Sequence, residues 1–535
     1  MLTSFRREFA IGNIHDAVDK KEAWCGKIID LHEGKEQVAV GTIYKEMNQK
    51  PNILEEFASD KTIGIAMPKV QDNYCSDDDE VFLEDHSGRV QLKADHQIAD
   101  ILLTGVVAGV RGLVTSAGEM IVTGICFGGL PSSASPQKAL KPSAPQGPYV
   151  LLVSGLNCGA QVNPLPFELL AQYVRGMLGT GQEMETVAAI QRVIVAGGLV
   201  NEQAGTKTNA AFGNRSLTSQ QQDVLASPMR EVDMLLSLLA GAVPVDVMPG
   251  QFDPTNRALP QQRLHPCLFR NSGRYSSFRS VTNPYEFSLG ELRFLGTSGQ
   301  NVDNAVRYVR HIQAFPGYVP NDLIKAKDIP KHDLHKFAKD PLNRILTMVN
   351  MLFWRHIAPT APDTLACYPF KESEPFVLRD TPSVFFAGNQ PDYASALLNE
   401  NGLSFDEHTN STSVHGVKDV ENSFANALKQ SKEEVGSVRL IAVPDFSKTG
   451  IAVLLNTETL ETTPLAFDTG ETANETPNEN IVLESTKEDI QVPEIKLKKV
   501  PTDTEELKKQ NRISTENSLT SPQNDDQEMD NSDVL

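Results

Sequence analysis

The stretch PYVLLVSGLN, residues 148–157, is an apolar run that ends in a loop containing glycine. Helical stretches follow it, PFELLAQYVRGML from residue 166 and REVDMLLSLLAGA from residue 230. The same strand-and-loop unit recurs as RVIVAGGLV from 192, VPVDVMPGQFD from 243, LRFLGTSGQN from 292 and SVFFAGNQPDY from 383. Strands that alternate with helices build parallel sheets, whose strand-end loops carry the site residues of α/β enzymes. The repeats therefore predict a layered α/β sheet domain laid out like an enzyme.

This α/β domain is expected to span residues 149–470. Its last part, VRLIAVPDFSKTGIAVLLNTETLETTPLAF from residue 438, reads as three strands with turns that close the sheet system. Two polar segments within it, about 305–345 and about 396–435, look like insertions. We expect both of them to lie on the surface.

A second domain precedes this one. Residues 35–130 carry short alternating or β-branched runs, and VFLEDHSGRVQL from residue 81 reads as two strands around a tight turn at Ser87 and Gly88. This hairpin resembles the central hairpin of OB-folds, so we predict an OB-fold β-barrel, with another five-stranded barrel as the alternative. Residues 131–148, rich in Pro, Ser and Ala, are predicted to be a linker.

The two ends of the chain differ from both domains. Residues 1–34 form a predicted helical lead-in, because apolar residues recur at helical spacing at Phe9, Ile11, Ile14 and Val18. Residues 471–535 are rich in Glu, Asp, Asn, Thr and Ser with almost no aromatic residues. Such a composition cannot bury enough apolar surface to offset the entropy lost on ordering, so we predict a disordered acidic tail.

Composition narrows the classes of function. The formal net charge is −20, and a surface of that sign repels phosphate, so contact with DNA is expected to be indirect. No apolar run reaches the roughly 20 residues needed to cross a bilayer, and no secretory signal is recognisable. The six cysteines form no CxxC pair, which predicts reduced thiols rather than a zinc site or a disulfide framework: Cys25, Cys75, Cys126, Cys158, Cys267 and Cys367.

The succession of glycine loops resembles the calcineurin-like metallophosphoesterases, whose strand-end motifs are DxH, GDxxD, GNHD, a lone His and GHxH. In that family these residues hold two metal ions that activate a water molecule and clamp a phosphate. Hard divalent cations need carboxylate or imidazole ligands. In this chain the DxH motif is replaced by Ser154 and Leu156, GDxxD by Gly198 and Asn201, GNHD by Gln251 and Phe252, and GHxH by Asn389 and Pro391. The resemblance thus implies a phosphoesterase-like fold whose metal ligands are lost, with no catalytic residue.

Two residues still match the motifs. His356 in RHIAPTAP corresponds to the lone His, and Asp253 keeps the last position of GNHD. One imidazole without partners is not a metal site. We therefore interpret His356 as a hydrogen-bonded structural histidine and Asp253 as a turn cap before Pro254.

Longer strings resemble the B-subunit family of DNA polymerases alpha, delta, epsilon and zeta, and specifically its delta branch. They are LLVSGLN from 151, VPVDVMPGQFDPTN from 243, LPQQRLHPCLF from 259, VTNPY from 281, FLGTSGQNV from 294, RHIAPTAPDTLACYPF from 355 and VPDFS from 443. The pair PGQFDPTN and LPQQRLHPCLF separates the delta type from the alpha and epsilon types. With the OB-like region, the resemblance covers about residues 35–470. Gln251 and Arg263 depart from it, standing where acidic and proline residues are expected.

The resemblance implies a non-catalytic scaffold subunit in DNA replication and repair. It would bridge the C-terminal cysteine-rich domain of the polymerase delta catalytic subunit and a third accessory subunit, and it would be shared with polymerase zeta in translesion synthesis. No cofactor is expected in this chain, since the iron–sulfur cluster of such complexes belongs to the catalytic subunit. The resemblance also implies a nuclear location, with DNA and the sliding clamp contacted only through other subunits. It assigns no interface residues.

Two other functions remain open at this level. An active metallophosphoesterase or nuclease with an unusual ligand set is favoured only by the fold pattern and His356. A single-strand DNA binder could use the OB-like region, where Tyr44 and Phe82 are the candidate aromatic residues. The acidic run SDDDE at 76–80 argues against that second role and favours protein docking.

Overall fold

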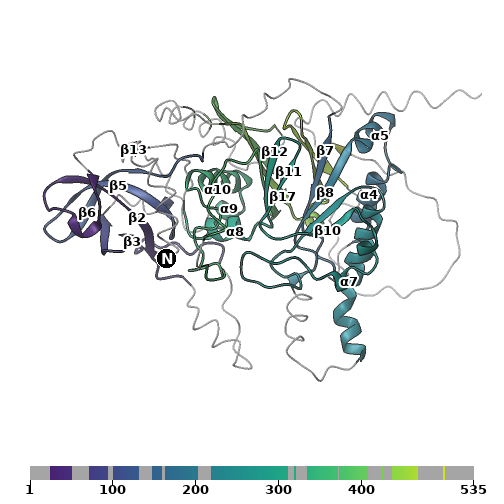
Figure 1. Cartoon of the computed structure of the whole chain (residues 1–535), viewed down its shortest axis with the longest axis horizontal. Helices are drawn as coiled ribbons and strands as arrows, with labels where there is room; N and C mark the ends of the chain where they lie inside the picture. The colour runs from purple at the N-terminus through teal and green to yellow at the C-terminus, as the bar shows by residue number, and fades with distance from the viewer. Residues whose placement is uncertain are drawn as a thin grey trace, which may run out of the picture.

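The structure is a computed structural model, and a β-barrel lies at one end of it (Figure 1). Sheets and helices follow in layers toward the other end. The structure describes residues 24–50, 71–93, 100–131, 147–159, 163–202, 219–310, 318–320, 334–370, 373–407, 409, 421, 425, 436–467 and 498–499.

Five strand pairings close the barrel. Strand β2 pairs with β3 and β5, β3 pairs with β4, and β6 pairs with both β5 and β4. Only the pairing of β4 with β6 is parallel. The bounds are β2 Glu36–Glu46, β3 Glu80–Glu84, β4 Arg89–Lys93, β5 Val107–Val114 and β6 Glu119–Cys126. A five-stranded barrel closed in this order is the arrangement expected of an OB-fold.

The predicted tight turn between β3 and β4 is present, and one carboxylate organises it. Asp85 Oδ1 accepts hydrogen bonds from the backbone N–H of Ser87 (2.7 Å) and Gly88 (3.1 Å). Its Oδ2 accepts from the backbone N–H of Ile28 (3.1 Å). Burial raises the pKa of Asp85, but these bonds together with one from the Ser87 hydroxyl outweigh it and lower the pKa. The turn is thus fastened to the segment that enters the barrel.

The α/β domain contains two sheets. The outer sheet has the order β10-β9-β8-β7-β18-β19-β20, and β7 to β10 run parallel. Its strands are β7 Tyr149–Val153, β8 Ile190–Ala196, β9 Val245–Met248, β10 Phe278–Ser280, β18 Ile451–Asn456, β19 Thr462–Ala466 and β20 Lys498–Lys499. The inner sheet has the order β11-β12-β14-β17-β15-β16. Its strands are β11 Tyr285–Leu289, β12 Leu292–Thr297, β14 Val384–Gln390, β15 Ala394–Asn399, β16 Gly402–Phe405 and β17 Val438–Pro444.

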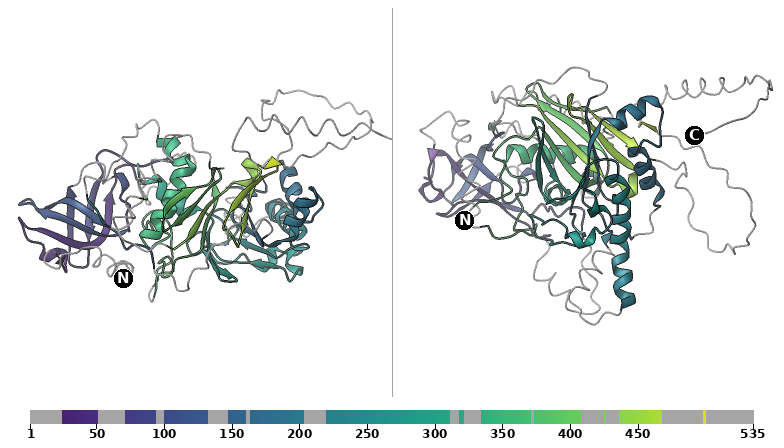
Figure 2. Two further views of the ribbon diagram at one scale, coloured as in Figure 1. Left: turned by 90° about the horizontal axis from the view of Figure 1, so that it is seen from above. Right: turned by 45° about the vertical axis from the view of Figure 1, so that its right-hand side comes forward.

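Helices cover the far face of each sheet (Figures 1 and 2). The outer sheet packs against α4 (Leu165–Val174), α5 (Gly181–Ala188) and α7 (Ser219–Ala240) around one apolar core. A second core lies between the two sheets, where Leu152 and Ile194 meet Phe386. The result is a four-layer helix–sheet–sheet–helix arrangement, which confirms the predicted sheet-rich α/β class.

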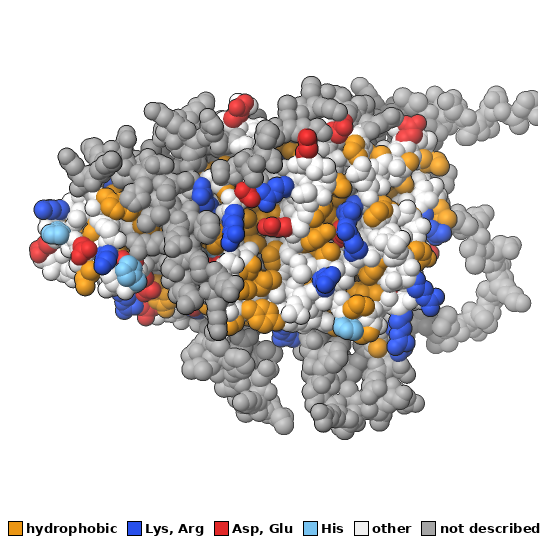
Figure 3. Space-filling view, in the orientation of Figure 1, with side chains coloured by type: hydrophobic (Ala, Val, Ile, Leu, Met, Phe, Trp, Pro, Cys, Tyr) orange, Lys and Arg blue, Asp and Glu red, His pale blue; other side chains and the backbone are white. Residues whose placement is uncertain are grey.

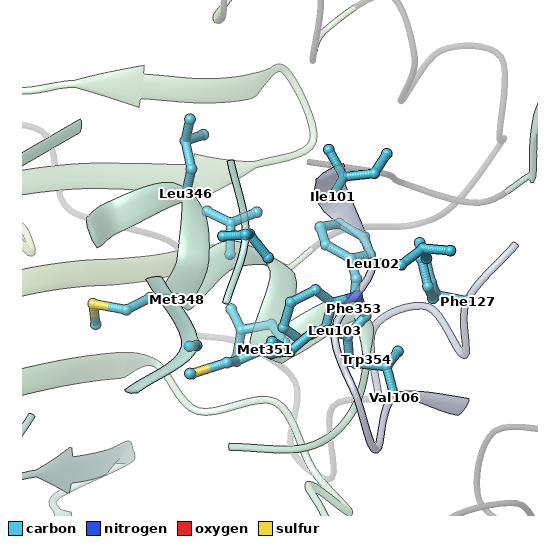
Figure 4. Packing of buried hydrophobic residues seen from close by; sticks show 14 of the residues in the cluster. Ile101, Leu102, Leu103, Val106, Phe127, Leu346, Met348, Met351, Phe353 and Trp354 are labelled. Atoms are coloured by element: carbon cyan, nitrogen blue, oxygen red, sulfur yellow. The ribbon is translucent and has the colours of Figure 1, made fainter. Parts of the chain in front are cut away.

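The barrel is packed directly onto the inner helices, α8 (Gln300–Arg307), α9 (Leu334–Lys339) and α10 (Pro341–Phe353). Figure 4 shows the contact: Leu102 and Phe127 of the barrel lie beside Phe353 and Trp354. The rings of Phe127 and Trp354 meet edge to face at 6.3 Å. A single apolar core therefore continues from the barrel into the α/β domain.

Polar contacts reinforce this junction. Asn73 Nδ2 donates to the carbonyl oxygens of Val306 (3.3 Å) and Val309 (2.6 Å), and Arg355 donates to those of Gly129 (2.9 Å) and Leu130 (2.8 Å). The barrel also gains a strand from the α/β domain, because β13 (Tyr318–Pro320) pairs with β6. The two domains are therefore joined by much more than the predicted linker 131–148.

The predicted surface segments differ from the structure in part. Within 305–345, Phe337, Leu342 and Ile345 are buried beneath the inner sheet. Within 396–435, β15 and β16 extend that sheet, and Leu398 and Leu403 are buried. Both segments are polar on average, and their composition therefore did not indicate the few apolar residues that are spaced to face the core. The surface expectation was wrong for these parts.

The ends of the chain are described only in small part. Residues 1–23, with the expected lead-in helix, lie outside the described residues, but Trp24–Cys25 form strand β1 beside β2. The barrel therefore begins before residue 35. Of the predicted tail, only β20 is described, and it pairs with β19. None of the described helices is both long and apolar enough to cross a membrane.

Candidate functional site

Six strand ends meet where the two sheets face each other. Parallel strands β7, β8 and β9 of the outer sheet and β12, β14 and β17 of the inner sheet all end there. Their loops enclose a cavity of about 420 Å³. It is lined by Asn157, Gly198, Asn201, Glu202, Gln251, Phe252, Ser298, Gln300, Asp303, Asn389, Asp445, Ser447 and Lys448.

Glycine is required in these loops by close approach of the backbones. A Cβ atom on Gly198 would lie 2.1 Å from Asn389 Oδ1, and one on Gly250 would lie 2.4 Å from the backbone nitrogen of Gly198. Gly198 also has a φ of +71°, which L-residues with side chains rarely adopt. The glycine loops thus serve the packing of the strand ends against one another.

Ser154 and Leu156 occupy the first motif position but have separate surroundings. The buried Ser154 hydroxyl donates to the carbonyl oxygen of Pro444 (2.9 Å) and accepts from the backbone N–H of Asn389 (2.8 Å). Leu156 points into the core beneath the outer sheet and beside Phe446. The hydroxyl therefore ties three strand ends together, whereas Leu156 takes no part in the cavity.

Two asparagines with positive φ cross-link further strand ends. Asn389 Nδ2 donates to the carbonyl oxygens of Ala196 (3.1 Å) and Ser298 (2.9 Å), joining β8, β12 and β14. Asn157 Nδ2 lies 2.9 Å from Asp445 Oδ1 and 2.8 Å from Ser447 Oγ, joining β7 to the loop after β17. Hydrogen bonds from amide side chains thus hold the strand ends of the two sheets together beside the cavity.

Asp253 also acts across loops. Its Oδ1 accepts from the backbone N–H of Leu199 (2.8 Å) and Val200 (3.0 Å), and its Oδ2 accepts from that of Gly250 (2.6 Å). The side chain is buried, and burial raises its pKa to about 6 against the lowering effect of its backbone donors. The interpretation as a turn cap was thus too narrow, since the carboxylate also clamps the loop after β8.

His356 lies away from the cavity. Its Nε2 contacts Glu374 Oε1 at 2.7 Å, and its Nδ1 accepts from the backbone N–H of Ala358 (3.1 Å). Both side chains are buried in the loops after α10. Ser298 and Gln300, which follow β12, line the cavity where the motif comparison would place His356.

The structure brings together only part of the predicted set. Gly198, Asn201, Gln251, Phe252 and Asn389 line the cavity, whereas Ser154, Leu156, His356 and Pro391 do not. Sequence reasoning missed Asn157, Glu202, Ser298, Gln300, Asp303, Asp445, Ser447 and Lys448. For Ser298 and Asp445 a signal existed, because each follows an apolar strand.

The polar lining of the cavity consists mainly of side chains that form hydrogen bonds. Of its three carboxylates, Asp303 is paired with Arg344, and Asp445 Oδ2 lies 2.7 Å from Lys448 Nζ. Among the residues that the structure describes, no group of three or more His, Cys, Asp and Glu is placed to share a metal ion. Amide side chains supply most of the remaining polar lining.

Comparison with known families defines the class of protein. Residues 150–395 match the family model of DNA polymerase alpha/epsilon B subunits. Residues 6–125 match the family model described as DNA polymerase delta subunit OB-fold domain. This match confirms the predicted barrel type. The matched region starts before residue 35, where the barrel domain was expected to begin.

Curated relatives narrow the class. The DNA polymerase delta small subunit of Oryza sativa subsp. japonica is 37% identical over 444 residues, covering 83% of this chain and 86% of the relative. That of Arabidopsis thaliana is 36% identical over 83% of this chain and 84% of its own length. The protein of the same name from Saccharomyces cerevisiae is 30% identical over 83% and 81%. The chain belongs to the family of DNA polymerase delta small subunits.

Proposed function

We propose that this chain is a non-catalytic accessory subunit of DNA polymerase delta that acts in DNA replication as a scaffold. The observation that carries the proposal is the identity of 30–37% to polymerase delta small subunits across both domains. The continuous core between barrel and α/β domain supports it, because a scaffold must hold its docking surfaces in fixed relation.

Its partners would be the C-terminal cysteine-rich domain of the catalytic subunit and a third accessory subunit. The same surfaces would also serve polymerase zeta in translesion synthesis, and the chain would act in the nucleus. Interfaces of this kind bury about 800 Å² on each partner, which the broad surfaces of a four-layer domain can supply.

The α/β domain is proposed to be an inactivated phosphoesterase domain. Support comes from the six strand ends that surround one cavity and from the donor set there, which is mainly amide and hydroxyl. Neutral amides do not generate a metal-bound hydroxide nucleophile or neutralise two divalent cations.

Co-expression tests the scaffold role. The full chain would be produced with the C-terminal cysteine-rich segment of a polymerase delta catalytic subunit and analysed by size-exclusion chromatography with metal analysis. We expect one joint peak, whose metal follows the partner segment. Separate elution of the two chains would contradict the proposal.

A separate preparation of the full chain tests the enzymatic alternative. The chain alone would be assayed with Mn²⁺ against a simple aryl phosphodiester, and its bound metal would be counted. We expect no turnover above the uncatalysed rate. Two equivalents of tightly bound Mn or Zn with turnover would show that the domain is an active enzyme.

A further inference from the structure

A basic surface follows the loop that lines the cavity. From Pro254 to Tyr285 the chain has five Arg and one His but no Asp or Glu, although the whole chain has a net charge of −20. The basic loop surface consists of Arg257, Arg263, His265, Arg270, Arg274 and Arg279, all of which are exposed. Figure 3 shows blue and pale-blue side chains in the lower right part of this face, where β10 and α7 lie in Figure 1.

The loop that carries these residues is firmly anchored. Leu264, Phe269 and Ser272 are buried between the exposed basic residues. Asp233 of α7 accepts from the backbone N–H of Ser272 (2.9 Å) and from its hydroxyl (2.6 Å). Alternation of buried anchors and exposed arginines fixes the backbone positions from which the arginine side chains extend. The backbone of the loop therefore needs little further ordering when a ligand binds.

Most of the arginines on this surface have no ion-pair partner among the residues that the structure describes. Arg279 pairs with the buried Asp246 at 2.9 Å. Arg257, Arg263, Arg270 and Arg274 form no ion pair with any residue in the described part of the chain. Four exposed guanidinium groups that form no ion pair among the described residues, on a chain that is acidic overall, favour an anionic ligand.

The type of basic side chain on this surface indicates which anion it would bind. All the fixed cations are Arg, whose planar fork matches phosphate oxygens, and none is Lys. Tyr275 lies between Arg274 and Arg279 in the chain and is 43% exposed. Exposed aromatic rings beside arginines are the elements with which proteins hold single strands, by stacking bases and neutralising phosphates. We propose that the basic loop surface binds single-stranded DNA, with Tyr275 stacking on a base.

The barrel is less suited to this role. Phe82 is buried, and Arg89 lies over its ring at 4.7 Å. Tyr44, the other candidate aromatic residue of the barrel, is half-buried. The DNA contact is therefore assigned to the α/β domain and not to the OB-fold. It goes beyond the scaffold role and revises the expectation that DNA is reached only through other subunits.

Fluorescence anisotropy with a labelled single-stranded oligonucleotide tests the proposal on the full chain. The test variant is Arg263→Gln/Arg270→Gln/Arg274→Gln. The control, Lys27→Gln/Lys35→Gln/Arg175→Gln, removes the same charge from exposed positions elsewhere. We expect the test variant to bind at least about tenfold more weakly at low salt, with a salt-dependence slope smaller by about 2, since each phosphate contact contributes about 0.7. The control should change affinity less than about twofold.

Two further arms separate the alternatives. Tyr275→Leu should weaken binding of the single strand but leave binding of duplex DNA unchanged. A synthetic peptide of residues 525–533, DDQEMDNSD, serves as an acidic polypeptide probe. No DNA binding by the wild type, or equal losses in test and control variants, would overturn the proposal. Binding of the acidic peptide without binding of DNA would overturn it in favour of a protein ligand.

Folding and scaffold function are checked independently. The test variant should keep the wild-type denaturation midpoint, because the replaced side chains are exposed. It should also co-elute with the catalytic subunit segment. Loss of DNA binding with intact co-elution separates this inference from the proposed function.

Discussion

Asp253 shows how one residue can keep its position in a motif while its role changes. The sequence identified it as the last residue of a metal-binding motif and as a cap. The structure adds hydrogen bonds to the neighbouring loop after β8. Contacts between residues 54 positions apart depend on the packing of two parallel strands, which local sequence does not encode.

The pH dependence of stability tests the state of this carboxyl. Its pKa is raised to about 6 in the folded chain, above about 3.9 in an unfolded chain. The folded state then holds more protons between pH 4 and 6, so the stability that Asp253 contributes is present below pH 4 and is lost as pH rises through 6. The stability difference between wild type and Asp253→Asn should fall by up to about 3 kcal/mol from pH 4 to pH 7.

Urea denaturation at several pH values measures this difference. Asp72→Asn provides the control, because Asp72 is an exposed carboxylate in the barrel domain. It should show no comparable change. A difference that grows with pH would mean that the backbone donors outweigh burial and that the pKa lies below its ordinary value.

His356 and Ser298 show that a match to a ligand type did not predict which residues line the cavity. His356 matched a motif by type, yet it lies outside the cavity and is bonded to Glu374. Ser298 matched no ligand type, yet it lines the cavity at the end of β12. The cavity residues are better predicted by their position after a buried strand than by their residue type. The reason is that the strand ends determine which residues meet between the two sheets.

At the element scale, long apolar repeats were predictable and short polar elements were not. The five strand-and-loop units correspond to β7, β8, β9, β12 and β14. Helix α10 was partly assigned to an insertion, although nearly all of it is buried. Strand β13 has three residues, and its pairing with β6 depends on docking of the barrel. Elements that are stabilised mainly by distant partners leave little signal in local composition.

A buried ion pair links strand β2 to the elements beside it. Lys45 is 2% exposed, and its Nζ lies 3.4 Å from Asp79 Oδ2 and 3.3 Å from the carbonyl oxygen of Tyr308 after α8. Replacing Lys45 by Met leaves the Asp79 charge buried without a cation. We expect a loss of about 3–5 kcal/mol in the free energy of unfolding, measured by chemical denaturation.

A double variant and a surface control complete this test. Lys45→Met/Asp79→Asn removes both charges and should recover a large part of the loss. Lys35→Met, at an exposed position, should change stability by less than about 0.5 kcal/mol. A Lys45→Met variant as stable as this control would show that the pair contributes nothing to the junction.

At the scale of the whole molecule, the barrel and the α/β domain share one core. Separate domains joined by a linker would unfold independently, whereas a continuous apolar core favours a single transition. The sequence predicted both domains, but it placed a Pro-rich linker between them and gave no sign of their contact. The surfaces that meet there are apolar in each domain, and an apolar sequence pattern alone does not distinguish a contact between domains from the interior of one domain.

The two tryptophans allow a direct test of this coupling. Trp24 lies in β1 of the barrel and Trp354 follows α10, so Trp354→Phe and Trp24→Phe variants each leave one fluorescent reporter. Within each variant, the denaturation midpoint from tryptophan fluorescence should coincide with the midpoint from circular dichroism of the same variant. Two distinct midpoints within one variant would show that the junction does not couple the domains.

The pairing of β13 with β6 has a consequence for synthesis on the ribosome. Strand β6 ends at Cys126, but its partner at Tyr318–Pro320 emerges only after nearly 200 further residues. Until then the last residues of β6, which β4 does not reach, carry unpaired backbone groups on one side. Such groups are templates for pairing with other chains. We therefore expect this chain to depend on chaperone protection during translation more than an OB-fold that is complete within its own sequence.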